Sequence, residues 1–225
     1  MIKVLFCNKK YKNELINFLE KRRIGESKNI KKVSKILEDI KKNKLKALIK
    51  YEKKYSKNNE IKISKDVVNR CIKKLKPNVK SSIDFSYSRI VKFHQQQVKH
   101  LRNFIYKDNY KNKLEYKYVP IESVGFYVPG NLPSTLLMNT IPAKLAKVKR
   151  LVLASPKING EYNPAILYAA KKVGIKEIYS MGGAQAIASL AYIQKVNKIV
   201  GPGNKFVSEA KRQLSGKIVG TETMF

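Results

Sequence analysis

The sequence has few of the residues that stabilise small secreted domains or bind metals. In 225 residues it contains two cysteines, Cys7 and Cys71, and two histidines, His94 and His100. The cysteines lie far apart, so neither a disulfide framework nor a zinc knuckle is indicated, and a reducing, cytoplasmic compartment fits best. The histidines do not share a helix face and have no carboxylate or cysteine partner at ligand spacing, so they predict no metal site.

Long apolar runs and acidic residues are also scarce. No stretch approaches the ~18 apolar residues of a membrane span, and the N-terminus lacks a signal-peptide core, so we expect a soluble protein without a membrane partner. The 16 Asp and Glu residues face 48 Lys and Arg residues, giving a formal net charge of +32. Such an excess ordinarily indicates a nucleic-acid partner. Because the lysines are scattered and arginine is rare, we interpret the charge as compositional bias; nucleic acid stays possible but disfavoured.

Apolar periodicity separates a helical region from an α/β region. Over about the first 110 residues, apolar side chains recur at three- and four-residue steps, and the last stripe continues from Ile83 to Ile105. From residue 114, short apolar runs alternate with helical segments, which predicts a parallel sheet with helices on both faces. Ser64, Ser134 and Asn163 are expected N-caps. Strands are expected at residues 2–6, 116–119, 123–128, 150–154, 176–179, 198–200 and 217–219, and the N-terminal helices at residues 10–21, 28–57, 64–76 and 80–105.

Three glycine-containing turns follow expected strands, at residues 127–134, 181–185 and 201–204. Ligands of open parallel sheets bind outside the carboxyl ends of the strands. A glycine-rich turn before a helix also bares backbone N–H groups, where an anionic or polar ligand can settle. The spacing matches neither the dinucleotide nor the P-loop fingerprint, and each turn alone could serve only packing. Three of them at one sheet edge favour a small-molecule site.

The blocks YVPG, PSTLLMN, IPAK, GGAQAIA and GPGN closely resemble histidinol dehydrogenase. This enzyme family uses NAD and zinc to oxidise L-histidinol to L-histidine, the last step of histidine biosynthesis. The resemblance spans about residues 29–214 and implies a cytoplasmic homodimer whose subunits contain two incomplete Rossmann-like domains. Residues 1–120 would be the helical start of the first, residues 121–219 the second α/β domain, and residues 220–225 a truncated tail.

The resemblance also implies a set of cofactor contacts. Carried over by position, Tyr127, Gln185 and Asn204 contact NAD. An aromatic ring and two amides on turns at strand ends suit this purpose, because amides both donate to and accept from ribose or carboxamide groups.

The family's zinc ligands and catalytic Glu–His pair have no counterpart in this sequence. We therefore expect a truncated histidinol dehydrogenase without catalytic or metal-binding residues, and no turnover by this chain alone. His94 and His100 match none of the family's ligands. Two alternatives stay open: an eroded enzyme that binds nucleic acid or protein through its basic surface, and one half of a split enzyme.

Overall fold

The computed structural model describes residues 11–222, without the side chains of residues 20–28. The expected strand at residues 2–6 and Cys7 lie outside the described residues. None of the described helices combines the length and the hydrophobicity that a membrane span requires.

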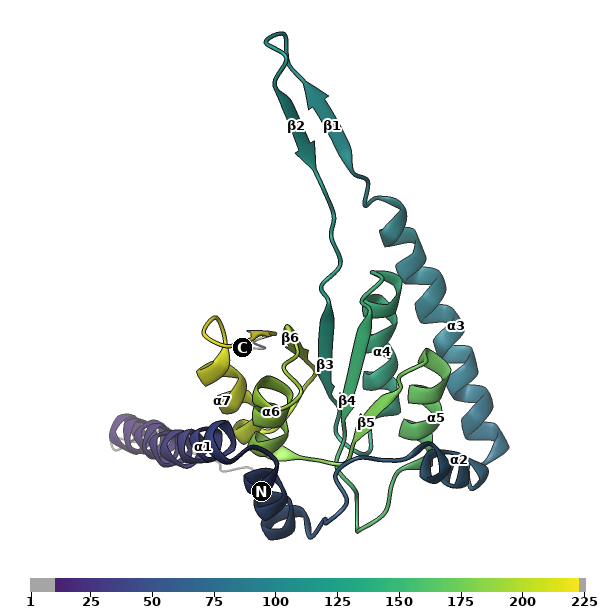
Figure 1. Cartoon of the computed structure of the whole chain (residues 1–225). Coiled ribbons are helices and arrows are strands. Elements are labelled where there is room, and N and C mark those ends of the chain that lie inside the picture. Colours follow the sequence, from purple (N-terminus) through teal and green to yellow (C-terminus); the bar gives the residue numbers. More distant parts are fainter. Residues whose placement is uncertain (1–10, 223–225) are drawn as a thin grey trace.

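A five-stranded, wholly parallel sheet forms the centre of the body (Figure 1). β3 lies in the middle and pairs with β4 on one side and β6 on the other. After β3, the chain adds β4 and then β5 on one side of it. It then crosses to the other side of β3 and adds β6 and β7, so the strand order reverses between β3 and β6. This confirms the predicted parallel sheet. In sheet order the strands are β5 (Glu177–Tyr179), β4 (Arg150–Ala154), β3 (Ser123–Tyr127), β6 (Lys198–Val200) and β7 (Gly220–Thr221).

Helices cover both faces of the sheet and enclose two apolar cores (Figure 1). The sequence dictates this because side chains alternate across each strand: Val124 and Phe126 enter one core, whereas Tyr127 enters the other. The first core contains α1 (Tyr11–Ser56), α6 (Gly183–Tyr192) and α7 (Lys205–Leu214). The second contains α2 (Lys65–Lys73), α3 (Pro77–Lys99), α4 (Pro133–Leu145) and α5 (Pro164–Val173).

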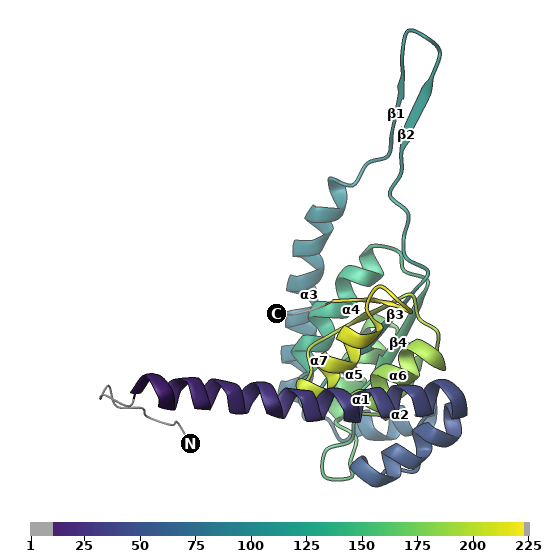
Figure 2. The same ribbon diagram turned by 90° about the vertical axis from the view of Figure 1, so that its left-hand side faces the viewer.

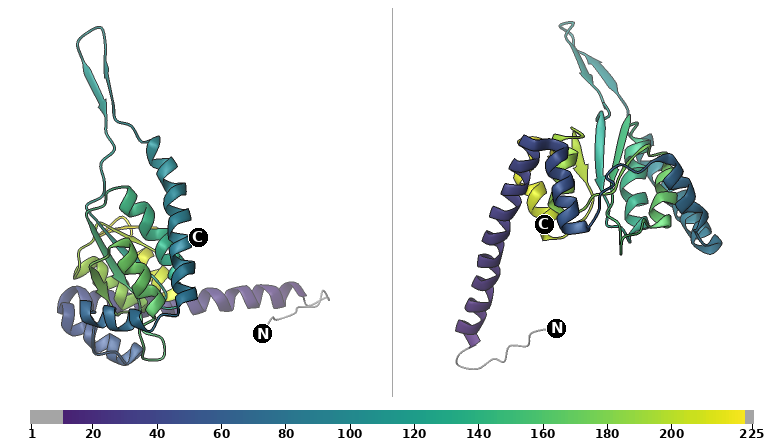
Figure 3. Two further views of the ribbon diagram at one scale, coloured as in Figure 1. Left: turned by 90° about the vertical axis from the view of Figure 1, so that its right-hand side faces the viewer. Right: turned by 60° about the horizontal axis from the view of Figure 1, so that its bottom comes forward.

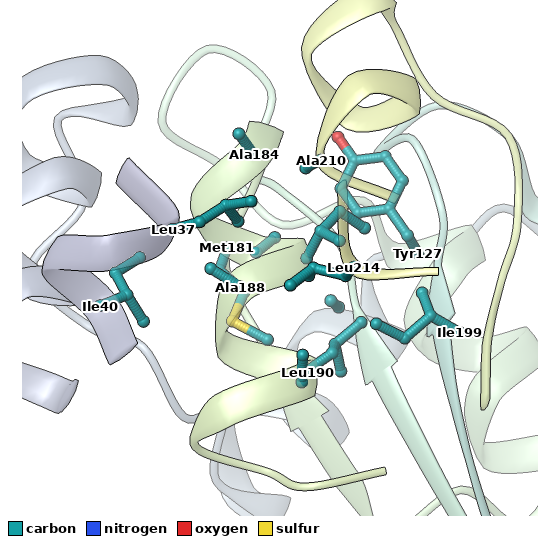
Figure 4. Packing of buried hydrophobic residues seen from close by; sticks show 14 of the residues in the cluster. Leu37, Ile40, Tyr127, Met181, Ala184, Ala188, Leu190, Ile199, Ala210 and Leu214 are labelled. Carbon is teal, nitrogen blue, oxygen red and sulfur yellow. The ribbon is translucent and has the colours of Figure 1, made fainter. Parts of the chain in front are cut away.

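Helix α1 replaces the two separate helices expected at the N-terminus. It is interrupted at Lys44, whose φ and ψ of 46° and −126° are not helical. Its first turns extend beyond the body (Figure 2), and its later turns pack on α6. Figure 4 shows Leu37 and Ile40 of α1 on one side of α6, with Leu214 on the other. The predicted apolar stripe of this helix is thus confirmed as its buried face from Val33 to Tyr51, whereas Tyr55, also expected on it, is exposed.

The segment after α1 binds the N-terminal region to the edge strand β5. The backbone N–H of Ile63 donates to Ile178 O at 3.0 Å, and that of Ser180 donates to Ile61 O at 2.6 Å. The buried Asn58 side chain donates to Ser180 O at 2.8 Å. The N-terminal helices therefore share both cores with the sheet, and the expected domain division at residue 120 stays a prediction.

Capping residues set the starts of α2 and α5 where the sequence placed them. Ser64 Oγ accepts from Val67 N at 3.3 Å at the start of α2, and Asn163 caps α5 in the same way. The predicted start at Ser134 is wrong, because Pro133 occupies the first position of α4 and its fixed φ suits that place. Helix α3 likewise begins at Pro77, earlier than expected.

An exposed antiparallel hairpin, β1 (Phe104–Lys107) and β2 (Lys113–Tyr116), leaves the body between α3 and β3 (Figure 3). The sequence placed Ile105 in a helix and a strand at residues 116–119; the first is wrong and the second is displaced. The reason is the Asp108 carboxylate, which accepts from the backbone N–H groups of Tyr110 and Asn112 and closes a turn. The final expected strand is also displaced, to β7.

Candidate functional site

The three glycine-containing turns meet at one edge of the sheet. They follow the carboxyl ends of β3, β5 and β6, and the strand order reverses between β3 and β6. In open parallel sheets, the crevice at such a reversal is where ligands bind. The convergence expected from the sequence is therefore confirmed as a feature of the fold.

The turns after β3 and β6 touch through their backbones. Gly201 has a φ of +116°, and a Cβ at this position would lie 2.0 Å from Tyr127 O. On the other side, a Cβ at Gly130 would lie 2.4 Å from Pro156 O, and one at Gly182 would lie 3.0 Å from Pro156 Cβ. Glycine thus lets these turns approach more closely than any side chain would allow.

Tyr127 is the last residue of β3 and is 5% exposed. Its ring belongs to the core between the sheet, α6 and α7 (Figure 4), and its hydroxyl accepts a hydrogen bond from Gly183 N at 3.3 Å. Burial raises the pKa of this hydroxyl, and the nearby Glu52 carboxylate adds to the rise, while the Gly183 N–H opposes it. The hydroxyl is therefore a neutral group. Its contact with NAD stays a prediction.

Gln185 lies in the first turn of α6 and is 4% exposed. Its Nε2 donates to Glu52 Oε1 at 3.0 Å. Its Oε1 lies beside Gly183, where a Cβ would come within 2.9 Å of that oxygen. Because Gly183 has no Cβ, the carbonyl oxygen of the Gln185 amide can lie this close to the backbone of the turn.

Glu52 is a functional candidate that sequence reasoning missed. It lies in α1, is 0% exposed, and accepts from Gly182 N at 2.9 Å through Oε1. Its other oxygen, Oε2, is buried and accepts no well-formed hydrogen bond from the described residues. Burial raises the pKa of the carboxyl, while contacts with Gly182, Ser56 and Gln185 oppose the rise. The sequence did contain a signal for Glu52. It lies four residues after Leu48, which places this acid on the apolar face of the helix.

The start of α6 is thus occupied by the chain's own side chains. Gly182 N–H is bonded to Glu52 and Gly183 N–H to Tyr127. For Gly182 and Gly183, the expectation that this turn bares its N–H groups for a ligand is wrong. The physical reason is that a buried helix end needs partners for its first N–H groups, and an anion suits that end of the helix dipole.

Asn204 is the N-cap of α7 and is itself exposed. Its Oδ1 accepts from Phe206 N at 3.0 Å and from Val207 N at 3.2 Å. Here too, backbone N–H groups that we expected to be free for a ligand donate to a side chain of the protein itself. With Oδ1 in the cap, Nδ2 is the atom of this amide that can donate to a ligand.

Lys211 and Glu222 fix the turn after β6. Lys211 is 5% exposed and its Nζ donates to Gly201 O, while the N–H of Gly201 donates to Glu222 Oε2 at 3.4 Å. Burial lowers the pKa of the Lys211 amine, and the charge of Glu222 opposes this. The turn is therefore fixed at its carbonyl and its N–H.

Helix α4, at the reversal of strand order, begins differently. Its N-cap residue is Leu132, and in the part of the chain that the structure describes no side chain caps it. Its first N–H groups are those that follow the β3 turn, the position at which dinucleotide-binding sheets place a pyrophosphate.

The described residues do not fit a metal. Nowhere among them do three or more His, Cys, Asp or Glu side chains gather so that they could hold an ion. His94 Nδ1 pairs with Gln97 Oε1 at 2.5 Å on α3, and His100 is the C-cap of that helix. A cavity of about 510 Å³ lies at the opposite edge of the sheet, where Asn197 and Gly220 mark the starts of β6 and β7, away from the three turns.

Comparison with known proteins identifies the family. A family model described as histidinol dehydrogenase matches residues 19–224. The chain belongs to the histidinol dehydrogenase family. This confirms the resemblance seen in the sequence, and a histidinol dehydrogenase is an oxidoreductase of histidine biosynthesis.

Individual histidinol dehydrogenases agree in sequence and in fold. The enzyme of Pelagibacter ubique (strain HTCC1062) is 51% identical over 232 residues, covering 100% of this chain and 54% of the relative. That of Caldanaerobacter subterraneus subsp. tengcongensis is 39% identical, covering 97% and 53%. The crystal structure of histidinol dehydrogenase from Elizabethkingia anophelis superposes with a TM-score of 0.78 at 38% identity, covering 84% of this chain and 46% of that one. The chain spans about half the length of the curated relatives it matches.

Proposed function

We propose that this chain binds NAD at the sheet edge formed by the three turns, as the nucleotide side of a histidinol dehydrogenase. The observation that carries the proposal is the reversal of strand order between β3 and β6, with the Gly201 turn against the backbone of Tyr127. The uncapped start of α4 lies at this place and offers N–H groups to a phosphate.

Each predicted cofactor contact has a defined chemical capacity in this proposal. The Asn204 amide has Nδ2 left for donation because Oδ1 caps α7. The Gln185 amide offers Oε1 as an acceptor, beneath the position that a Cβ at Gly183 would fill. Tyr127 is neutral and closes the floor of the site. A donor and an acceptor at opposite sides suit ribose hydroxyls and a carboxamide.

When bound, NAD supplies the hydride acceptor for oxidation of histidinol. Zinc belongs to the family's chemistry, but the described residues do not fit it, so no step is assigned to zinc here. We propose that the 225 residues bind NAD without oxidising histidinol, because a group that activates the alcohol and a base that takes its proton are needed as well. Multiple turnovers of NAD reduction with histidinol and zinc would contradict this.

Calorimetric titration of the chain with NAD tests the site. We expect saturable binding that is weakened in Gln185→Ala and in Asn204→Asp. The second variant keeps an oxygen to cap α7 and removes only the amide donor, so its stability is expected to stay near that of the wild type. Gly216→Ala, just beyond the C-terminal end of α7, is the control, and we expect its affinity for NAD to be unchanged. Unchanged affinity in both site variants would place NAD elsewhere.

We also propose a cytoplasmic homodimer. The hairpin exposes large apolar side chains over both strands, which is unusual for a surface that faces only water. Light scattering at increasing protein concentration should show a dimer, and Phe104→Ser with Tyr116→Ser, which breaks a stacked ring pair at 5.4 Å, should shift it toward monomer. The exposed residues are Phe104, Ile105, Tyr106, Tyr110, Leu114, Tyr116, Tyr118 and Val119.

A further inference from the structure

We propose that Glu52 is a positioning residue for NAD binding, acting through Gln185 and the start of α6. This rests on the proposed function, because it takes Gln185 as a cofactor contact. Glu52 comes from α1, 133 positions from Gln185, and nothing in the glycine turn itself indicates a carboxylate behind it.

One carboxylate oxygen holds two different groups. Glu52 Oε1 accepts from Gly182 N at 2.9 Å and from Gln185 Nε2 at 3.0 Å. Gly182 is the N-cap of α6 and has no side chain with which to cap the helix. Glu52 therefore bonds the N–H of the N-cap residue from another helix, as the glutamate of a capping box does, and the same atom ties Gln185 to the start of α6.

This arrangement fixes which way the Gln185 amide points. Glu52 Oε1 accepts the hydrogen bonds of both groups, so it faces the NH₂ group of the amide and not its oxygen. The oxygen then faces Gly183, where a Cβ would come within 2.9 Å of it, so glycine leaves the room that this orientation needs. Without Glu52, the amide can rotate by half a turn and present its donor instead of its acceptor.

The carboxylate is held in place independently of any ligand. The apolar stripe of α1, including Leu48 and Tyr51 beside Glu52, is buried in the core with α6. Asn58, farther along the chain, makes a separate buried contact with Ser180 and does not reach α6. The Asn58 side chain therefore anchors the same connection through Ser180. The backbone N–H of Asn58 donates to Glu52 O at 3.3 Å, and Asn58→Ala keeps this bond, which makes the variant the matched control.

The direct test is the side-chain amide signal of Gln185 in ¹⁵N-resolved NMR spectra of the chain without NAD. We expect Glu52→Ala to shift this signal and Asn58→Ala to leave it in place. In calorimetry, Glu52→Ala should weaken NAD binding by about tenfold or more, whereas Asn58→Ala should not, even where both lower the melting temperature. Glu52→Gln keeps a carbonyl at the same reach, so it should restore most of the affinity.

A double-mutant cycle with Gln185→Ala completes the test. If Glu52 acts through Gln185, adding Glu52→Ala to Gln185→Ala weakens binding by much less than it does alone. If Gln185→Ala weakens binding and Glu52→Ala does not, the positioning role is wrong and the NAD site stands. If the wild-type chain binds no NAD, or Gln185→Ala changes nothing, the proposed function fails and this inference with it.

Should Glu52→Ala not fold, the pair Glu52→Asp and Glu52→Gln carries the same test. The aspartate is shorter by one methylene and cannot reach both donors, so it should shift the Gln185 signal and weaken binding. The glutamine has the full length and should do neither. Equal behaviour of these two variants would overturn the inference.

Discussion

Replacing Gly201 by alanine tests whether the three turns form one packed unit. The added Cβ would lie 2.0 Å from Tyr127 O and 3.0 Å from Tyr127 C, both of them backbone atoms of β3. β3 is paired with β4 and β6 along its length, so it cannot move away without breaking sheet hydrogen bonds. The strain therefore cannot be relieved by rotating a side chain.

The size of the effect follows from two contributions. A positive φ of +116° is unfavourable for alanine, at about 1–2 kcal/mol. A carbon–oxygen contact normally stays near 3.3 Å, so the turn must also move by roughly 1 Å against the sheet. We expect a total loss of at least about 4 kcal/mol in the free energy of unfolding, which is at the severe end for a single substitution.

Gly216→Ala is the matched control. Gly216 also has a positive φ, +70°, but no atom lies within 4 Å of its Cβ position. It should therefore show only the backbone contribution, about 1 kcal/mol after the gain from a stiffer unfolded chain. Urea denaturation followed by far-UV circular dichroism gives both values. Losses that agree within about 0.5 kcal/mol would refute the steric argument, because only Gly201 has the contact.

Three further predictions use capping and charge. Asn204→Ala should lower the free energy of unfolding by about 1 kcal/mol through loss of the α7 cap, and Asn204→Asp should not, as thermal denaturation will show. The pKa of Glu52 is raised above 4.5, so the folded state holds the proton longer than the unfolded state. The stability of the wild type relative to Glu52→Gln should hence fall as the pH rises above about 4.5, and a flat difference would contradict burial as the cause. The hydrogen bond from the Arg150 guanidinium lowers the pKa of Glu177. Because the pair is part-exposed, it should stabilise the fold by less than about 1 kcal/mol at neutral pH, and this stabilisation should disappear below pH 4.5 as the carboxylate takes up its proton. Urea titrations of Glu177→Gln and the wild type at acid and neutral pH measure the difference.

Elements specified by local sequence were predictable. The strands at Arg150–Ala154 and Lys198–Val200 were placed to the residue, and the cap at Asn163 was also found. Periodicity and capping are properties of a few neighbouring residues, so they can be read without knowing the rest of the fold. The hairpin at residues 104–116 was missed because its apolar residues continued the stripe of α3, and the Asp108 turn that ends the helical pattern was not recognised.

The inner partners of the site could not be predicted from local pattern. Gln185 and Asn204 lie on the expected turns, but the contact of Gln185 with Glu52 joins segments 133 residues apart. Whether a backbone N–H is free for a ligand depends on such distant contacts. A glycine turn indicates that its backbone N–H groups can be approached closely. Only the fold shows whether a side chain of the protein already accepts their hydrogen bonds.

The hydrogen-bond partners at the starts of α4, α6 and α7 indicate a different role for each of the three turns. At α6 the N–H groups of Gly182 and Gly183 donate to Glu52 and Tyr127, and at α7 those of Phe206 and Val207 donate to Asn204, so these N–H groups are used within the chain. In the described residues, α4 begins without a side-chain cap, at the reversal of strand order. We therefore propose that a phosphate binds at α4, because the N–H groups that follow Pro133 have no side-chain cap and lie at the positive end of the helix dipole. The turns before α6 and α7 then contribute amide side chains, whose direction is set by what lies behind them.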